Sequence, residues 1–447
     1  MTGNRTAALC NLGCKVNAYE TDAMEKLLRE AGYVIVPFDS PADVYVINTC
    51  SVTNMADRKS RQMLHRAKKL SPDSVIVAAG CYVQGAKAVD DAADLWIGNH
   101  EKNQLVPLLE KVLTERKKLQ EVSEIGEIRD YEDMVIASAG ERTRAFIKVQ
   151  DGCNQFCSYC LIPYVRGRVR SRKIEDVVRE IQELTEKGFQ EFVLTGIHLS
   201  SYGTDFSGDA PKADQFGEEQ LLELIESVHT IEGVKRIRLG SLEPRIITEK
   251  FVGKLAALPK VCPHFHLSLQ SGCDDTLKRM NRHYTAKEYA EGVEILRRKY
   301  EHPAITTDVI VGFPGEDERE FGETVAFLEN LQLFEMHIFK YSSREGTVAA
   351  KMPQSLTDRE KSERSDVLEE MTIRQSAVFR KFYEGKRVSV LFEEEKEIGG
   401  KQYFVGHTPE YCMVAVEAED ALENRILDVW IEKEKDGIIF GKVDFSS

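Results

Sequence analysis

Three cysteines lie within eight positions of the segment GCNQFCSYC, residues 152–160. They are Cys153, Cys157 and Cys160, and so dense a set of thiols suits a soft metal ion or an iron-sulfur cluster. A structural zinc site and an ordinary iron-sulfur cluster each take four protein ligands. Either a fourth ligand lies elsewhere in the chain, or one metal position is left open for a ligand from outside.

A second set of three cysteines ends three apolar segments near the amino terminus. Cys14, Cys50 and Cys81 close the segments LGC, VINTC and VAAGC. Their separations are each about one βαβ unit, so parallel strands could bring the thiols to the sheet edge where α/β proteins bind ligands. We predict a second three-cysteine site there, and the alternative is three buried thiols that only pack. Cys10 lies inside the first strand and is expected to be a core thiol.

The composition is that of a globular protein, with 42% hydrophobic and 30% charged residues among 447. The length allows about two to four domains. The first residues lack the plan of a signal peptide and no run of 18 apolar residues occurs, so we expect a cytoplasmic protein without a membrane partner. Ten cysteines in such a chain are expected to be metal ligands or buried thiols. The net charge of −14 on average disfavours binding of a polyanion such as RNA. Such binding would depend on local clusters of basic residues.

The elements that must position these residues form three blocks of an α/β protein. Residues 1–115 alternate apolar strands with helical patterns and predict a doubly wound α/β domain. Residues 116–143 carry mixed charge with weak periodicity, and we interpret them as a linker. Residues 376–447 contain short strands with polar turns and predict a small antiparallel β-barrel, a fold that often binds RNA.

The central block, residues 144–375, holds six strand-like segments that alternate with helices. This order predicts a partial (βα)6 barrel with its chemistry at the carboxyl ends of the strands. The triple-cysteine loop follows the first strand. The ends of the next three strands carry the candidate cofactor contacts Gly196, Ser241, Glu243 and Gln270. For each of them a purely structural role is nearly as plausible on sequence grounds.

The spacing Cys-x3-Cys-x2-Cys resembles the motif of the radical S-adenosylmethionine (SAM) enzymes. The resemblance implies that Cys153, Cys157 and Cys160 hold a catalytic 4Fe-4S cluster whose open iron binds the amine and carboxylate of SAM. Reductive cleavage of SAM then yields a 5′-deoxyadenosyl radical, so the cofactor supplies the hard chemistry. Zinc is the rival occupant, with His198 as the closest downstream histidine.

The chain as a whole resembles the radical SAM methylthiotransferases. The resemblance rests on GCKVN, NTCSVT and AAGC, then GCNQFCSYC, LKRMNRHY and DVIVGFPGE, then a barrel similar to the TRAM module. It implies that Cys14, Cys50 and Cys81 bind a second 4Fe-4S cluster, whose open iron carries the sulfur to be inserted. One SAM would supply the methyl group and another the radical, and a low-potential electron donor such as flavodoxin or ferredoxin is required.

Lys15, Val16 and Asn17, with NTCSVT, resemble the members that act on N6-threonylcarbamoyladenosine in tRNA. Gln-Met-Asn in place of Lys15, Val16 and Asn17 would suggest the enzymes that act on isopentenyladenosine. The implied reaction is 2-methylthiolation of that nucleoside at tRNA position 37. The alternatives are a methylthiotransferase for isopentenyladenosine or for an aspartate of a ribosomal protein and, in a different class, a non-catalytic metal-dependent RNA-binding protein.

Basic residues gather beside the cysteines in spite of the acidic total. Three groups are Arg166, Arg168, Arg170, Arg172 and Lys173; Arg58, Lys59, Arg61, Arg66, Lys68 and Lys69; and Lys278, Arg279 and Arg282. We predict that they contact phosphates of tRNA, with a merely solvated face as the alternative for about half of them. We expect no DNA partner.

Overall fold

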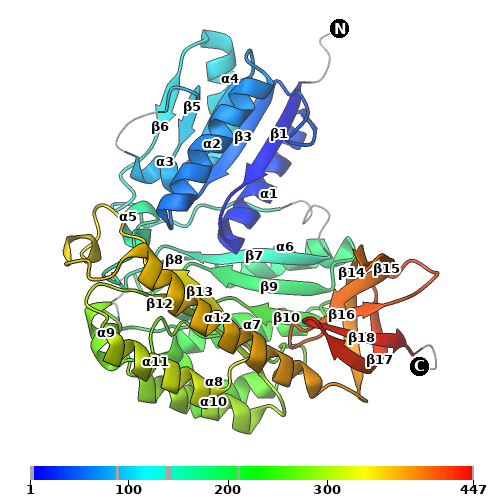
Figure 1. The fold of residues 1–447 in the computed structure, drawn as a ribbon. Coiled ribbons are helices and arrows are strands. Elements are labelled where there is room, and N and C mark those ends of the chain that lie inside the picture. The colour runs from blue at the N-terminus through cyan, green and yellow to red at the C-terminus, as the bar shows by residue number, and fades with distance from the viewer. Residues whose placement is uncertain (1–4, 87–89, 137–142, 209–211, 213, 445–447) are drawn as a thin grey trace.

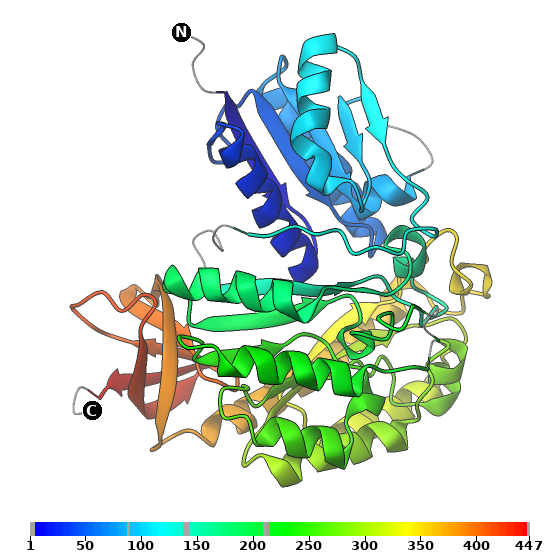
Figure 2. The same cartoon turned by 180° about the vertical axis from the view of Figure 1, so that it is seen from behind.

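The computed structural model describes residues 5–86, 90–136, 143–208, 212 and 214–444. They form an amino-terminal α/β domain, a central α/β domain and a carboxyl-terminal β-barrel, as predicted (Figure 1). The first domain stands on the central one, and the carboxyl-terminal barrel lies beside the central domain (Figures 1 and 2). Among the described helices, none has the length and apolar character needed to cross a bilayer.

The amino-terminal domain is built on a parallel sheet of six strands in the order β2-β1-β3-β4-β5-β6. The strands are β1 (Thr6–Asn11), β2 (Val34–Ile35), β3 (Val44–Thr49), β4 (Val75–Gly80), β5 (Leu95–Ile97) and β6 (Leu119–Glu121). The helices are α1 (Lys15–Glu30), α2 (Asn54–Leu70), α3 (Cys81–Gly85) and α4 (Leu105–Glu115). Both β3 and β4 are buried at every residue, as expected for strands covered on both faces.

The segment interpreted as a linker belongs in part to the first sheet. Strand β6 pairs with β5, so the sheet extends to Glu121 and past the expected boundary at residue 115. A strand of three residues is too short to show a period in the sequence. Met134 and Ile136 farther along are buried, and the main chain of Ile136 donates to Glu180 Oε1 at 2.7 Å. The linker therefore packs between the domains, while its residues 137–142 lie outside the described part.

The central domain is a partial barrel of six parallel strands. They are β7 (Arg144–Asp151), β9 (Glu191–Gly196), β10 (Arg236–Leu239), β11 (His264–His266), β12 (Ala304–Val311) and β13 (Glu335–Lys340). Single bridges from Ile237 to Val261 and from Leu242 to Leu267 join its two halves. The short β8 (Arg170–Ser171) pairs antiparallel with β7 at the edge.

Helices cover the outer side of the barrel (Figure 2). They are α6 (Ile174–Glu186), α7 (Glu218–Thr230), α8 (Glu249–Ala256), α10 (Ala286–Lys299) and α11 (Glu318–Leu331). The short helices α5 (Ile162–Val165) and α9 (Asp274–Arg279) lie in connections after strands. The predicted alternation of six strands and helices is confirmed.

The carboxyl-terminal barrel is closed in the order β14-β15-β16-β18-β17 and follows the long helix α12 (Asp358–Lys381). Its strands are β14 (Arg387–Ile398), β15 (Lys401–His407), β16 (Met413–Val416), β17 (Ile426–Lys435) and β18 (Ile438–Val443). All pairs are antiparallel except β16 with β18, which is parallel. The predicted small antiparallel barrel is confirmed. The direction of the β16–β18 pair could not be predicted, because alternation of apolar residues predicts strands and not their directions.

A tyrosine of the carboxyl-terminal barrel closes the floor of the central one. The ring of Tyr411 stacks on His264 with centroids 5.2 Å apart, and the guanidinium groups of Arg144 and Arg238 each lie 4.8 Å from its centroid. Arg238 also donates to the carbonyl of Pro409 at 2.8 Å. These contacts fix the third domain against the amino ends of the central strands.

Candidate active site

The triple-cysteine loop has a backbone that depends on glycine. Gly152 has φ +71°, and a Cβ there would lie 1.8 Å from the carbonyl oxygen of Arg168. The amide of Cys153 donates to the carbonyl of Gly167 at 3.1 Å, and the amide of Cys160 donates to that of Cys157 at 3.0 Å. The chain thus turns tightly enough for three thiols to share one loop.

The segment LKRMNRHY holds this loop in place. The amide of Ser158 donates to the carbonyl of Met280 at 2.9 Å, and the Asn281 side chain donates to the carbonyl of Phe156 at 3.0 Å. Arg282 donates from Nη1 to Cys157 Sγ at 3.2 Å and from Nη2 to Glu243 Oε2 at 2.9 Å. The prediction that Arg282 contacts RNA phosphate was wrong, because its guanidinium donates hydrogen bonds to the cysteine loop and to a buried carboxylate.

Two thiols of the loop are partly buried, and their ionisation is costly without a cation. Burial raises the pKa of Cys160 to about 12 and raises that of Cys153 strongly, and the neighbouring Cys157 contributes to both shifts. Backbone amides point at the sulfurs: Gln155 N lies 3.5 Å from Cys153 Sγ, and Ile162 N lies 3.4 Å from Cys160 Sγ. A bound metal group would supply the missing positive charge, and such N–H···S contacts tune iron-sulfur clusters.

Two of the predicted cofactor contacts lie one side chain away from this loop. A Cβ on Gly196 would lie 2.7 Å from Gln150 Oε1, and the Gln150 amide donates to the carbonyl of Gly152 at 2.7 Å. Glu243 is linked to Cys157 by Arg282, which donates a hydrogen bond to each of them. Burial opposes ionisation of Glu243, but the charge of Arg282, together with His198, outweighs it and lowers its pKa to about 2.

The other two predicted contacts lie apart from this pair. Ser241 is exposed two residues before Glu243. Gln270, with φ +73°, lines a separate cavity beside Tyr159. His198, the candidate zinc ligand, places Nδ1 2.7 Å from Ser201 Oγ and Nε2 3.8 Å from Glu243 Oε2. Its Nδ1 is therefore engaged with Ser201, while Nε2 is buried near Glu243 without a hydrogen-bond partner among the described residues.

The second set of cysteines gathers at the carboxyl ends of β1, β3 and β4, as predicted. Cys14 precedes α1, Cys50 follows β3 and Cys81 begins α3. Gly13 has φ +114°, and a Cβ there would lie 3.0 Å from Cys50 Sγ. Burial, with smaller contributions from the nearby Cys81 and Cys14, raises the pKa of Cys50 to about 11. The three thiols thus act on one another electrostatically.

A buried network of charges connects the two cysteine sites across the domain interface. Glu20 of α1 accepts hydrogen bonds from Lys102 at 2.7 Å, from Lys148 at 2.7 Å and from Arg166 at 2.8 Å. Arg166 also donates to Asn17 Oδ1 at 2.7 Å. Burial disfavours the charged form of Glu20, yet Arg166, Lys102 and Lys148 outweigh it and hold its pKa well below the usual range.

The same network reaches the second cysteine set through two amide side chains. Cys14 Sγ lies 3.8 Å from Asn17 Oδ1, and the Asn99 amide lies 3.5 Å from Cys81 Sγ. Asn99 also donates to the carbonyl of Val165 at 2.7 Å. No pattern in the sequence indicates this network, because Glu20 and Lys102 lie in ordinary helical contexts.

The predicted basic patch after the first cysteine loop is mostly internal. Arg166, Arg170 and Arg172 are at most 1% exposed, so the prediction that they contact RNA was wrong. At least two of them form ion pairs with buried carboxylates instead: Arg172 pairs with Glu180, and Arg166 pairs with Glu20. A run of arginines in a sequence does not reveal whether acids from other domains will enclose it.

The basic residues of α2 are largely on the surface. Arg58, Lys59, Arg61, Arg66 and Lys69 are exposed, and α2 begins four residues after Cys50. Arg279 of the third group pairs with Glu320. Accessible positive charge near the site therefore comes mainly from the first domain.

A cavity of about 250 Å³ lies between the two cysteine loops. Val52 and Thr53, which follow Cys50, form part of its wall, and Tyr159 of the triple-cysteine loop forms another part. Asp308 and Ile310 of β12 line it from the barrel interior. A substrate placed there would touch residues of both three-thiol loops.

The donor sets fit iron-sulfur clusters better than zinc. Each site has three thiols, and His198, the nearest downstream histidine, faces Ser201 and Glu243. Among the described cysteines, Cys262, Cys273 and Cys412 are buried at other places and join neither set. Three thiolates with amide donors are the ligand pattern of a cluster that keeps one iron open.

Comparison with known proteins agrees with this geometry. The family model "Radical SAM superfamily" matches residues 147–328, and "Uncharacterized protein family UPF0004" matches residues 6–98. The fold is similar to that of the radical S-adenosylmethionine methyltransferase TsrM from Kitasatospora setae, with a TM-score of 0.53 and 14% identity over 75% of this chain and 73% of that one. The barrel and its three-thiol loop define a radical SAM protein.

Similarity to curated proteins identifies the subgroup of radical SAM proteins to which the chain belongs. The chain is 39% identical to threonylcarbamoyladenosine tRNA methylthiotransferase MtaB of Bacillus subtilis, over 96% of this chain and 94% of that one. It is 34% identical to tRNA-2-methylthio-N(6)-dimethylallyladenosine synthase of a Sulfurihydrogenibium species, over 94% and 95% of the two chains. The chain belongs to the family of radical SAM tRNA methylthiotransferases.

Proposed function

We propose that this protein methylthiolates C2 of N6-threonylcarbamoyladenosine at position 37 of tRNA. The observation that carries the proposal is the cavity of about 250 Å³ bounded by residues of both three-thiol loops. Relatives named for threonylcarbamoyladenosine, at 35–39% identity over most of the chain, support this nucleoside.

Cys153, Cys157 and Cys160 would hold one 4Fe-4S cluster, and Cys14, Cys50 and Cys81 a second. When bound, these clusters and SAM supply one-electron chemistry that can functionalise an aromatic C–H, for which no side-chain base is strong enough. We assign Gly196, Ser241 and Glu243 to SAM and Gln270 to the substrate side of the cavity. A low-potential donor such as flavodoxin or ferredoxin would supply electrons in the cytoplasm.

The surface around the cavity supports an RNA partner. Large apolar side chains are exposed there, among them Val52, Met55, Tyr164 and Phe339. The exposed basic face of α2 begins beside them. Unstacked bases of single-stranded RNA bind to apolar and aromatic side chains, while cations hold the phosphates.

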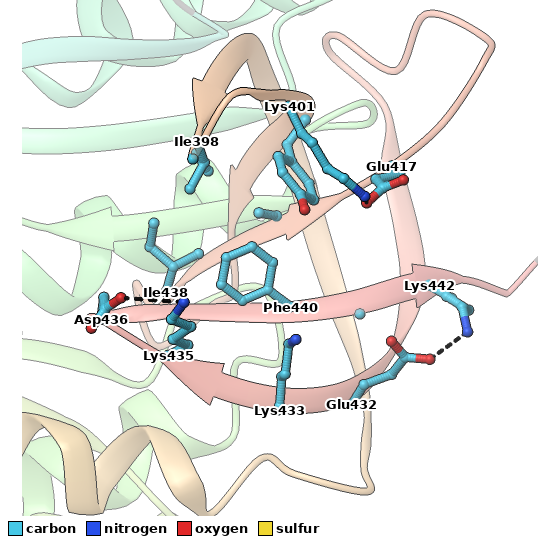
Figure 3. Close-up of a pocket in the computed structure, with 14 residues that line it drawn as sticks. Ile398, Lys401, Glu417, Glu432, Lys433, Lys435, Asp436, Ile438, Phe440 and Lys442 are labelled. Atoms are coloured by element: carbon cyan, nitrogen blue, oxygen red, sulfur yellow. Dashed lines mark hydrogen bonds and ion pairs between the residues drawn. The ribbon is translucent and has the colours of Figure 1, made fainter.

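The carboxyl-terminal barrel offers a second RNA surface. A groove of about 500 Å³ lies on its outer side, and the rings of Tyr403 and Phe440 lie 5.5 Å apart there. Figure 3 shows Phe440 among the residues that line this groove. Lys433 Nζ lies 5.8 Å from the Phe440 ring centroid, and Lys401 and Lys442 pair with acids at its rim. Aromatic faces beside lysines suit stacked bases.

The test combines nucleoside analysis with reconstitution. Deleting the gene should remove 2-methylthio-N6-threonylcarbamoyladenosine from tRNA and leave the unmodified precursor. Anaerobically reconstituted protein should hold about eight irons and release 5′-deoxyadenosine on reduction. Loss of the 2-methylthio derivative of isopentenyladenosine would instead assign the other tRNA nucleoside, and bound zinc without SAM cleavage would overturn the enzyme assignment.

A further inference from the structure

The loop that follows β13 holds the first domain close to Cys50. Its residues Ser342 and Ser343 accept hydrogen bonds from Asn54, the first residue of α2. The main-chain N–H of Asn54 donates to Ser342 Oγ at 3.3 Å, and its side-chain amide donates to the carbonyl of Ser343 at 3.0 Å. Arg344 comes next and donates from Nη1 to Asn54 Oδ1 at 2.5 Å. Consecutive residues of the central domain therefore contact one residue of the first domain.

The guanidinium of Arg344 also binds two other residues after Cys50. Its Nη2 donates to Ser51 Oγ at 2.9 Å and to Asp57 Oδ2 at 2.5 Å. Ser51 directly follows Cys50 in the chain, and Arg344 is buried, with 6% of its surface exposed. A guanidinium is planar and presents its donors in a fixed fork, so it fixes the relative positions of the groups that accept from it. Arg344 therefore determines where the chain after Cys50 lies relative to the central domain.

The other end of the same loop contacts the triple-cysteine loop. The N–H of Ala349 donates to the carbonyl of Ser158 at 2.7 Å, and Ser158 directly follows Cys157. A turn connects this contact to Arg344. The N–H and the Oγ1 of Thr347 both donate to the carbonyl of Arg344, at 3.1 and 2.7 Å. One short loop of the central domain therefore contacts the chain beside both sets of cysteines.

These contacts adjoin the walls of the cavity between the two sets. Val52 and Thr53 of the wall directly follow Ser51, which accepts from the guanidinium. Tyr159, another wall residue, directly follows Ser158. Ser342 of the loop itself also lines the cavity. A displacement of this loop would therefore move wall residues that come from both sets.

Stability alone is a weak reason to bury Arg344 here. Removing a guanidinium and a carboxylate from water costs about as much as their attraction returns, and apolar replacements of such pairs are often neutral or stabilising. What the planar fork provides is orientation. Orientation has a large effect on rate, because a misplacement of about 1 Å can cost roughly a hundredfold.

We propose that Arg344 is a positioning residue, which holds Cys50 and its neighbours at a fixed distance from the triple-cysteine loop. One substrate carbon in the cavity can then meet the groups bound at both sets of thiols. The proposal rests on the proposed function. Arg344 acts through Ser51, Asn54 and Asp57, all of which belong to the first domain. SAM cleavage at the thiols of the central domain therefore does not depend on Arg344, whereas methylthiolation does.

The test compares two reactions of the same reconstituted Arg344→Gln enzyme. It should keep about eight irons and release 5′-deoxyadenosine at a rate within about twofold of the wild type. Its kcat for methylthiolation should fall roughly ten- to hundredfold, while KM for the RNA changes by less than about threefold. Hydrogen exchange of this holoenzyme should be faster over residues 51–57 and 342–349, because the lost contacts join these segments. Asn54→Ala, at an exposed position, should change both readouts in the same direction but less.

Arg364→Gln is the matched control. Arg364 is also buried, but its partners Glu316 and Glu318 belong to the central domain. This variant should keep the wild-type ratio of methylthiolation to SAM cleavage and the wild-type exchange over residues 51–57.

Three results for Arg344→Gln would overturn the proposal. The first is a wild-type ratio of the two reactions with wild-type exchange over residues 51–57. The second is an equal loss of both reactions, which a merely structural role would give. The third is a fall to about four irons, since Arg344 would then be needed to form the Cys50 site and not to place it. Failure of the wild-type enzyme to methylthiolate the RNA would instead refute the proposed function, and exchange over residues 51–57 would still test the contact.

Discussion

Replacing Glu20 with glutamine removes a negative charge around which three buried cations gather. The Glu20 side chain is fully buried, and Lys102, Lys148 and Arg166 all donate to it within 3.0 Å. In the variant Asp151 is the carboxylate that remains for Lys148 and Arg166, at 2.6 and 3.1 Å. Removing one partner from a buried charge cluster costs about 3–5 kcal/mol, a large part of a typical stability of about 5–15 kcal/mol.

The control is Glu25→Gln on the same helix. Glu25 forms a surface ion pair with Arg29 at 2.9 Å, of the i,i+4 kind that contributes only about 0.3–0.5 kcal/mol. Urea unfolding followed by circular dichroism should therefore separate the two variants by about 3 kcal/mol. Hydrogen exchange should rise in α1 and β7, because the lost contacts join these elements.

Catalysis gives a second measurement of the Glu20 variant. The network joins α1 of the first domain to the central domain, so methylthiolation should fall more than SAM cleavage, because the cysteines proposed for SAM cleavage all lie in the central domain. A Glu20→Gln protein as stable as Glu25→Gln, with the same ratio of the two activities as the wild type, would refute the reasoning.

Three other predictions concern the cysteine loop, its carboxylate and the RNA surface. Gly152→Ala would place a Cβ 1.8 Å from a backbone oxygen, so reconstituted protein should lose about half its iron, whereas Gly253→Ala, with no atom within 4 Å, should keep it. Glu243, whose pKa of about 2 lies below the ordinary 4.5, stabilises the fold above about pH 4.5 and loses this contribution as the pH falls toward 2. In the wild-type apoprotein the ionised Glu243 contributes roughly 3 kcal/mol to the free energy of unfolding at neutral pH. Urea unfolding should therefore show that this free energy falls less between about pH 5 and about pH 3 in Glu243→Gln than in the wild type, and the same pH dependence in both proteins would contradict this. Phe440→Ala should weaken binding of anticodon stem-loop RNA by about 1–3 kcal/mol in a filter assay without changing SAM cleavage, and unaltered binding would exclude the barrel groove.

Much of the architecture followed from the sequence because its signals are local. Strand β4 is a continuous apolar run, β3 begins with one, and the six strands of the central barrel alternate with helices of ordinary length. The cysteine spacing alone predicted one three-thiol loop. The second set followed from a rule of topology, that parallel strands place their carboxyl ends at one edge.

The sequence by itself determined which residues carry the chemistry, while the tertiary structure decided what surrounds them. Arg166 and Arg282 looked like surface cations, yet one is enclosed by Glu20 and Asp151 and the other by Glu243 and Cys157. Glu20 lies in an ordinary helix, and only the docking of the first domain on the barrel brought it beside Lys148. The physical reason is that burial and charge pairing depend on groups that lie more than 100 residues away in the chain, such as Arg166 Nη2 and Asn17, separated by 149.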